Sequence, residues 1–143
     1  MLATLGFLIR KRYWQEAKAL AFATLGILIM VDRILKPIFG RSRPPQPRLV
    51  HDLGGDSFPS GHAAGNLVFY FYLAFLLAAQ YPKSTKYIYI LATIIVLLIG
   101  FGSIYTKAHW ATDVIGGYLF GYLWLLVSLS VLKFLDRNSR VKS

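Results

Sequence analysis

The chain has 143 residues, enough for one domain, and a net charge of +10. Hydrophobic residues make up 56% of it, charged residues 15%, and the mean hydropathy is +0.52, which excludes an ordinary soluble domain. The absence of Cys excludes a disulfide framework and a thiolate metal site. We therefore expect an all-α integral membrane helical bundle, forming a single membrane-embedded domain over residues 1–143, and no nucleic-acid partner.

The predicted elements begin with an apolar stretch, residues 1–9, that is too short to cross a membrane. Three basic residues and an aromatic pair follow it, so residues 1–16 are interpreted as the tail of an earlier helix with its cytoplasmic loop. The chain is therefore either a fragment or a shortened form. Four apolar segments then predict transmembrane helices at about residues 16–35, 62–81, 87–106 and 111–132.

The four predicted spans differ in length. The last three contain uncharged runs long enough to cross a hydrocarbon core of about 30 Å as helices. The first contains an uncharged run at residues 19–31 and reaches spanning length only if the helix continues through Asp32 and Arg33. A loop rich in Pro, Gly, Arg and Asp, residues 37–61, separates it from the second span.

The alternation of four spans divides the basic residues unequally between the two membrane faces. Ten of the 16 Lys and Arg fall on one face, which the positive-inside rule places in the cytoplasm. The other six fall on the opposite face, where a phosphate ligand would explain them: Arg33, Lys36, Arg41, Arg43, Arg48 and Lys107. We expect a bacterial-type inner-membrane protein with its site on this outer, periplasmic or extracellular face.

The remaining ionisable residues gather on the same outer face. All three His and four of the Asp lie there, at span ends or in loops: His51, His62, His109, Asp32, Asp52, Asp56 and Asp113. Ionisable groups at the rim of a membrane are costly and usually functional, so the set favours a site over a group of solvated loop charges.

Three short patterns within this set suggest chemistry, although each has an ordinary structural interpretation. His109 and Asp113 are four residues apart on one helix face, which suits either a carboxylate-oriented nucleophile or an interfacial His paired with Asp. The sequence at residues 59–62, Pro-Ser-Gly-His, places backbone N–H groups at a helix start. Such a start either binds an anion or is simply capped by the Ser side chain. Lys36 and Arg43 offer cations to phosphate or form a basic juxtamembrane patch.

Taken together, these residues resemble the type 2 phosphatidic acid phosphatase superfamily, which also contains bacterial acid phosphatases and vanadium haloperoxidases. Its first block, Lys-x6-Arg-Pro, is matched by residues 36–44, and its second, Pro-Ser-Gly-His, by residues 59–62. The His-x3-Asp of its third block is matched by His109 and Asp113. The spans around these blocks are similar to the membrane-bound branch, so the expected fold is a truncated form of that branch's six-helix bundle.

The resemblance implies a mechanism for each matched residue. His109 would attack phosphorus and form a phosphohistidine, Asp113 would orient His109, and His62 would protonate the leaving alcohol and then activate water. Phosphate oxygens would be bound by Lys36, Arg43, Ser60 and Gly61. No cofactor and no metal would be needed, and His51 matches no position of the family.

The chain departs from the family pattern at the Ser-Arg of the third block, where it has Gly102-Ser103. The missing Arg is one of the family's phosphate ligands, so Ser103, Lys107 and Arg41 are candidates to fill its place. The main hypothesis is a phosphatase of phospholipid metabolism that acts on a lipid phosphate or diphosphate. The alternatives are a catalytically weakened protein that binds lipid phosphate and a small structural or pore-forming membrane protein. The substrate head group, the tail and the oligomeric state stay open.

Overall fold

The computed structural model describes residues 6, 10, 13–45 and 55–141, with side chains as far as residue 133. The helices are α2 (Trp14–Met30), the π turn η1 (Val31–Leu35), α3 (Lys36–Phe39), α4 (Gly61–Gln80), the 3-10 turn η2 (Pro82–Ser84), α5 (Thr85–Tyr105) and α6 (Ala111–Val141). The described residues contain no strand, so the all-α prediction is confirmed for them.

Within the described part of the chain, three helical segments are long and apolar enough to cross a membrane: Gly61–Gln80, Pro82–Tyr105 and Ala111–Lys133. They correspond to the second, third and fourth predicted spans. The first predicted span is a continuous helical run from α2 through η1 to α3, in which α2 itself has 17 residues. Four spans are therefore not established, although three are supported.

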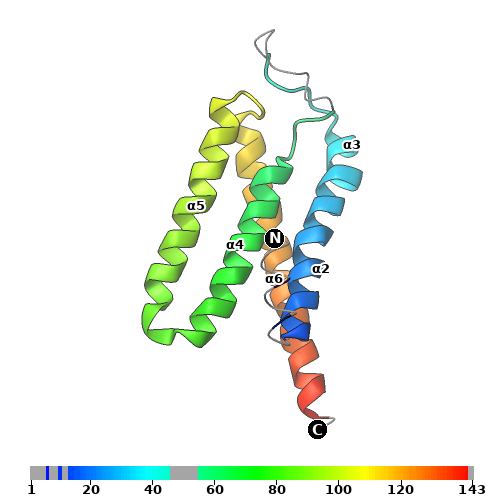
Figure 1. Ribbon diagram of the computed structural model, residues 1–143. Helices are drawn as coiled ribbons and strands as arrows, with labels where there is room; N and C mark the ends of the chain where they lie inside the picture. Colours follow the sequence, from blue (N-terminus) through cyan, green and yellow to red (C-terminus); the bar gives the residue numbers. More distant parts are fainter. Residues whose placement is uncertain (1–5, 7–9, 11–12, 46–54, 142–143) are drawn as a thin grey trace.

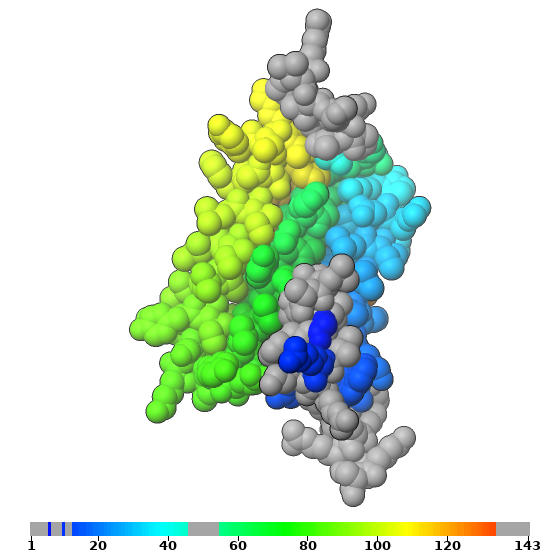
Figure 2. All heavy atoms as spheres, in the orientation of Figure 1, coloured from blue at the N-terminus to red at the C-terminus, as the bar shows by residue number. Residues whose placement is uncertain are grey.

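Helix α4 lies at the centre of the bundle and contacts α2, α5 and α6. In Figure 1, α5 and α2 lie on opposite sides of α4, while α6 crosses behind. The space-filling view shows α5 at one edge of the same face and the α2–α3 run at the other (Figure 2). The starts of α4 and α6 and the end of α3 meet at one end of the bundle, as the threading of alternating spans predicts (Figure 1).

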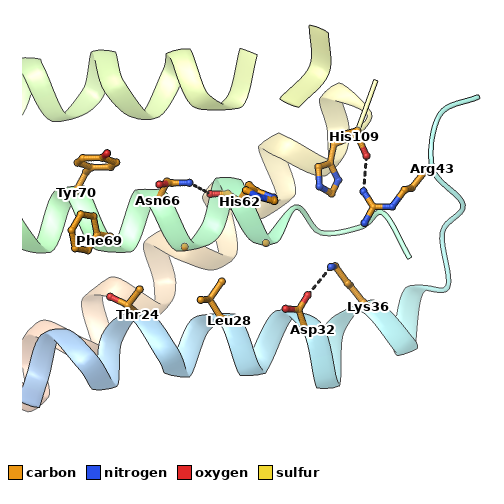
Figure 3. A pocket seen from close by; sticks show the side chains of 13 residues that line it. Thr24, Leu28, Asp32, Lys36, Arg43, His62, Asn66, Phe69, Tyr70 and His109 are labelled. Atoms are coloured by element: carbon orange, nitrogen blue, oxygen red, sulfur yellow. Dashed lines mark hydrogen bonds and ion pairs between the residues drawn. The ribbon is translucent and has the colours of Figure 1, made fainter. Parts of the chain in front are cut away.

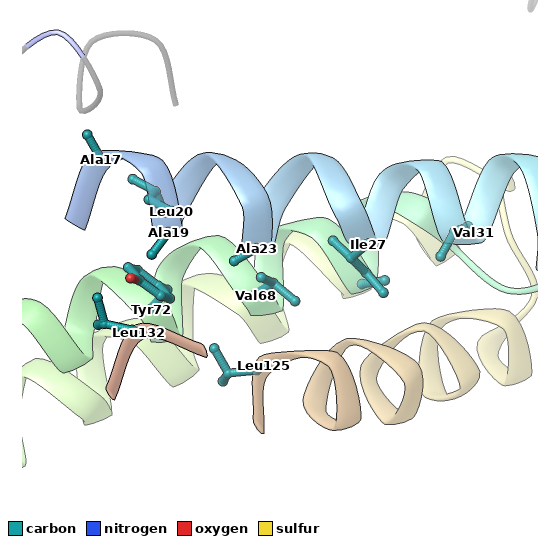
Figure 4. Packing of buried hydrophobic residues seen from close by; sticks show 11 residues of the cluster. Ala17, Ala19, Leu20, Ala23, Ile27, Val31, Val68, Tyr72, Leu125 and Leu132 are labelled. Carbon is teal, nitrogen blue, oxygen red and sulfur yellow. The ribbon is translucent and has the colours of Figure 1, made fainter. Parts of the chain in front are cut away.

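The buried apolar core lies between α2, α4 and α6 (Figure 4). Its members include Leu20, Ala23, Ile27, Val31, Val68, Tyr72, Leu125 and Leu132. By contrast, α5 exposes many large apolar side chains, such as Leu97, Leu98 and Phe101. An outward apolar face of this kind is expected where lipid replaces water around a bundle.

Glycines let the start of α6 approach the start of α4 closely. A Cβ atom added to Gly117 would lie 2.5 Å from the Ser60 carbonyl oxygen, and one added to Gly121 would lie 2.9 Å from the Ala64 carbonyl oxygen. Neither position has room for a larger residue without movement of the backbone. Gly117 and Gly121, one turn apart, therefore allow close packing that holds two of the site-bearing helix ends together.

Two element ends differ from those predicted. The predicted loop at residues 37–61 begins later, because α3 continues to Phe39 and ends at Gly40, whose φ of 55° places it in the left-handed region that glycine adopts easily. Helix α6 also continues to Val141, well past the predicted end at 132. Charged and polar residues end a membrane span but not a helix, because Lys, Arg and Leu are good helix formers.

Candidate active site

A pocket of about 580 Å³ opens at the end of the bundle where the predicted motifs meet. Its walls are the α2–η1–α3 run, the first half of α4 and the loop before α6 (Figure 3). The polar end is lined by Asp32, Lys36, Arg43, His62, Ala108 and His109, and the rest by Thr24, Leu28, Gly61, Gly65, Asn66, Phe69 and Tyr70. The structure therefore brings Lys36, Arg43, Gly61, His62 and His109 together, whereas their roles stay predictions.

His109 lies in the tight loop between α5 and α6 and is buried, with 4% of its surface exposed. The backbone N–H groups of Ala108 and His109 both donate to the Ser103 carbonyl, which fixes the loop. The His109 Nδ1 lies 2.9 Å from the Ser57 carbonyl oxygen. A carbonyl only accepts, so Nδ1 carries the proton in this contact, and a neutral ring has its lone pair on Nε2.

The predicted contact between His109 and Asp113 takes a different form. The Asp113 Oδ2 atom is 3.7 Å from the His109 Nδ1, too long for a hydrogen bond. Instead Oδ2 accepts from the Trp110 N–H at 2.8 Å, and Oδ1 pairs with the Arg41 guanidinium at 2.9 Å. The Ser57 carbonyl bonds the imidazole, and fully buried Asp113 holds the loop that carries it, so the orienting role of Asp113 stays a prediction.

Arg41 forms an ion pair with Asp113 and does not line the pocket. Its guanidinium also donates to the Thr112 hydroxyl at 2.6 Å and lies 5.6 Å from the Trp110 ring centroid. Its carbonyl accepts from the Ser57 N–H at 2.7 Å. The prediction that Arg41 could replace the missing Arg at position 103 is therefore not supported by its position.

His62 faces His109 across the polar end of the pocket (Figure 3). The two ring centroids are 6.4 Å apart. His62 lies in the first turn of α4 and is exposed, and Asn66, one turn later, donates to the His62 carbonyl at 2.8 Å. Two imidazoles at this separation, one buried and one open, can act on a group placed between them.

The two predicted cations reach the pocket from different supports. The Lys36 Nζ lies 2.6 Å from the Asp32 Oδ1, one turn earlier on the same helical run. The Arg43 guanidinium donates to the Ala108 carbonyl at 2.8 Å, which ties the segment after α3 to the loop that carries His109. Figure 3 shows Lys36 and Arg43 at the same end of the pocket as the two His rings.

Ser60 and Gly61 form the start of α4 as the sequence suggests. The fully buried Ser60 hydroxyl accepts from the Ala63 N–H at 3.2 Å and is therefore an N-cap. The Ser60 N–H donates to the Asp113 carbonyl at 2.9 Å, which joins the starts of α4 and α6. Gly61 lines the pocket and Ser60 lies behind it, so direct phosphate binding by Ser60 stays a prediction.

Two other candidates lie away from the pocket. The half-buried Ser103 donates its hydroxyl hydrogen to the Ile99 carbonyl at 3.0 Å, and Lys107 is exposed, with φ of 55°. Neither lines the pocket. His51, Asp52 and Arg48 lie outside the described residues.

The surroundings of His109 favour its neutral form. Burial lowers the pKa of His109 below its usual value of 6.5, and the nearby positive charge of Arg43 lowers this pKa further. The Ser57 hydrogen bond and Asp113 act in the opposite direction without reversing the shift. A neutral ring at pH 7 retains the lone pair that a nucleophile needs.

Three contributors to the site were missed at the level of sequence. Ser57 acts through its backbone carbonyl, so its residue type gives no signal. Arg41 was considered only as a phosphate ligand, although a second cation two residues before Arg43 is a signal for a separate partner. Asn66 was overlooked, although its position one turn after His62 within an apolar span indicates a polar role.

Comparison with known proteins adds independent findings. The sequence model of the PAP2 superfamily matches residues 3–137. Phosphatidylglycerophosphatase B of Bacillus subtilis is 35% identical over 120 residues, covering 82% of this chain and 57% of the relative. YbjG of Escherichia coli, proposed to be an undecaprenyl-diphosphatase, is 28% identical over 106 residues, covering 71% of this chain and 50% of the relative.

A solved structure also resembles the bundle. The crystal structure of a transmembrane PAP2-type phosphatidylglycerolphosphate phosphatase from Bacillus subtilis superimposes with a TM-score of 0.76 and 29% identity, covering 93% of this chain and 64% of that one. The chain thus spans between half and two thirds of the length of these relatives.

Proposed function

Because the chain belongs to the PAP2 superfamily, we propose that it is a membrane phosphatase that hydrolyses a lipid phosphate or lipid diphosphate through a phosphohistidine. One observation carries the proposal: His62 and His109, with ring centroids 6.4 Å apart, face a pocket that Lys36 and Arg43 also line. Phosphoryl transfer needs a nucleophile, an acid and positive charge around one phosphorus atom, and these residues supply all three.

The first half of the reaction transfers the phosphoryl group to the protein. The Nε2 lone pair of His109 attacks the terminal phosphorus and forms an N–P bond while the P–O bond to the leaving group breaks; the leaving group is the lipid alcohol of a monophosphate or the lipid monophosphate of a diphosphate. Protonated His62 gives its proton to the departing oxygen, so the alcohol leaves neutral. The Ser57 carbonyl, hydrogen-bonded to Nδ1–H, orients the attacking ring and stabilises the positive charge that develops on it.

The second half releases phosphate. Neutral His62 takes a proton from a water molecule whose oxygen attacks phosphorus, and the N–P bond breaks to restore neutral His109. Lys36 and Arg43 hold the equatorial oxygens, where negative charge collects in the transition state, and the Gly61 backbone lies beside them. No step requires a metal ion, so metal independence is part of the proposal.

The shape of the pocket suits a lipid better than a soluble phosphate. It continues from the two His rings along α2 and α4 to Leu28, Phe69 and Tyr70 (Figure 3). An apolar tail directed along these side chains would leave water while its phosphate stays at the polar end. We further propose that the α2–η1–α3 run is a fourth span and that the polar end faces the outside of a bacterial inner membrane.

Phosphate release from a panel of lipid phosphates in detergent tests the proposal, with His109→Ala as the control. We expect release by the parent protein, no release by His109→Ala, and the same rate with a metal chelator present. Loss of release in chelator that a divalent ion restores would contradict the metal-free mechanism. Release that His109→Ala leaves intact would contradict the assignment of the nucleophile.

A second candidate function is binding of lipid phosphate without turnover. It is favoured by the neutral Ser103 at the position of a family Arg. It is also favoured by the position of Lys107, which does not line the pocket. Rapid quench of the protein with a radiolabelled lipid phosphate separates the two functions. A phosphohistidine, which is acid-labile and base-stable, is expected only for the enzyme.

A further inference from the structure

Asp32 is a carboxylate that lines the pocket, and the proposed chemistry does not use it. Its side chain is 53% exposed and lies 2.6 Å from the Lys36 Nζ. It belongs to the π turn η1, and π turns within α-helices are often found at functional sites. A negative charge beside an anion-binding site weakens anion binding, so its presence there needs a reason.

The order of residues along the pocket fixes where Asp32 acts. Four positions spaced by four residues face the pocket in turn along the α2–η1–α3 run: Lys36, Asp32, Leu28 and Thr24 (Figure 3). At ~1.5 Å per residue the row is roughly 18 Å long. His62, Asn66, Phe69 and Tyr70 follow the same direction on α4. Asp32 therefore lies between the cation end and the apolar part.

A bound lipid must pass this point. With the reacting phosphate at Lys36, Arg43 and the two His rings and the tail toward Phe69, the group next to the leaving oxygen lies beside Asp32. In a lipid phosphate monoester this group is an uncharged carbon chain. In a lipid diphosphate it is a second phosphate, whose negative charge the carboxylate repels.

We infer that Asp32 is a specificity-determining residue that favours lipid phosphate monoesters over lipid diphosphates. The inference rests on the proposed phosphatase function and narrows its substrate class. In this role, Asp32 discriminates by repelling the lipid diphosphate. Repulsion of the wrong substrate is a common source of discrimination between ligands that share one reacting group. A structural role is the competing explanation, since Asp32 could serve only to hold Lys36, and that role would affect both substrates equally.

A pair of lipids with the same tail distinguishes the two roles. Farnesyl phosphate and farnesyl diphosphate differ only in the second phosphate, so the ratio of their kcat/KM values for phosphate release cancels any effect common to both. We expect Asp32→Asn to raise the diphosphate-to-monophosphate ratio by about tenfold. Glu16→Gln, which removes a carboxylate at the far end of α2, should leave the ratio unchanged.

A ratio that Asp32→Asn leaves unchanged would overturn the inference, even if both rates fall. A second measurement keeps it testable without turnover: the dissociation constants of the two lipids for His109→Ala and for His109→Ala with Asp32→Asn. If the parent releases no phosphate, the proposed function fails, whereas the ratio of dissociation constants still tests Asp32 and should change by about tenfold. Asp32→Ser replaces Asp32→Asn if melting shows the latter unfolded.

Discussion

Two of the walls of the pocket are built in opposite ways. The nucleophile wall, formed by residues 41–45, 55–60 and 106–113, is held by contacts between residues far apart in the chain: His109 with Ser57, Arg41 with Asp113, and Arg43 with Ala108. The cation wall is the α2–η1–α3 run, residues 14–39. Its ion pair, Lys36 with Asp32, lies within one helical run and is partly open to water.

This difference between the walls corresponds to two separate requirements of phosphoryl transfer. The attacking ring must be fixed before the substrate arrives, because a misplaced nucleophile loses much of the rate that orientation supplies. The binding cation can move with the phosphate as charge shifts, and a Lys on a flexible stem suits this better than a fixed fork. We expect changes to the nucleophile wall to affect turnover and folding together, and changes to the pocket-lining residues of the cation wall to affect substrate and transition-state binding with little effect on folding.

The largest effect is expected from Arg43→Gln, because Arg43 contacts the nucleophile loop and also lines the pocket. Loss of one preorganised donor should lower kcat/KM by about 10²–10³. The Arg43 charge lowers the pKa of His109, so its removal raises this pKa and shifts the acid limb of the kcat/KM profile to higher pH.

The measurement for this variant is kcat/KM as a function of pH, from about pH 5 to 8. Arg33→Gln is the control, since Arg33 is exposed on η1 and does not line the pocket. An acid limb that stays in place in Arg43→Gln would show that the ionisation of His109 does not set it.

The next largest effect concerns the folding free energy that each wall contributes. Arg41→Gln leaves the fully buried Asp113 without its ionic partner and should cost about 3 kcal/mol of folding free energy, at the low end for broken buried pairs because the Arg41 side chain is 40% exposed. Lys36→Gln breaks a more exposed pair and should cost less than about 1 kcal/mol. Thermal melting in detergent compares the two; equal losses would remove the distinction between the walls.

A smaller effect is expected where the two site-bearing helices touch. Gly117→Ala forces a methyl group toward the Ser60 carbonyl and should cost about 1–2 kcal/mol, with a loss of turnover because the start of α4 shifts. Gly102→Ala is the matched control: its Cβ would have no neighbour within 4 Å, and removal of a helical Gly should stabilise α5 by about 0.5–1 kcal/mol. Melting temperatures and initial rates of both variants test the contrast, which equal behaviour would contradict.

The smallest effect is expected from Ser103→Arg, which restores the family residue. The Ser103 side chain is directed to Ile99 and not into the pocket, so an Arg there must reach around the loop. We expect turnover to rise, by less than about tenfold. Initial rates of phosphate release for the parent, Ser103→Arg, Lys107→Ala and the double variant test this. A neutral Ser103→Arg beside an inactive Lys107→Ala would show that Lys107 supplies the missing charge.

Local signals made the three apolar spans and the meeting of the site's cations and His residues at one end of the bundle predictable. The length of an uncharged run predicts a span. Alternating spans bring their ends to one face, which places together the residues Lys36, Arg43, His62 and His109. The end of α6 was not predictable in the same way, since hydropathy reports the membrane boundary and not the helix boundary.

The nucleophile wall was predictable only in part. The spacing of His109 and Asp113 suggested a direct hydrogen bond, but the His lies in a loop before the helix, where helical spacing does not apply. The bond goes instead to a backbone carbonyl, which no residue type encodes. Arg41 and Asp113 lie 72 positions apart, so their pairing depends on the tertiary fold.

The π turn η1 carries a consequence for the evolution of such proteins. A residue advances a regular helix by about 100°, and a π turn accommodates one residue more than an α-helical turn. Deleting a single residue from Val31–Leu35 would therefore let the helix become regular while Lys36 keeps its face relative to Leu28, whereas a deletion from a regular helix rotates every later residue by about that angle. The π turn thus absorbs a one-codon change in length between Leu28 and Lys36 and leaves the cation wall facing the pocket.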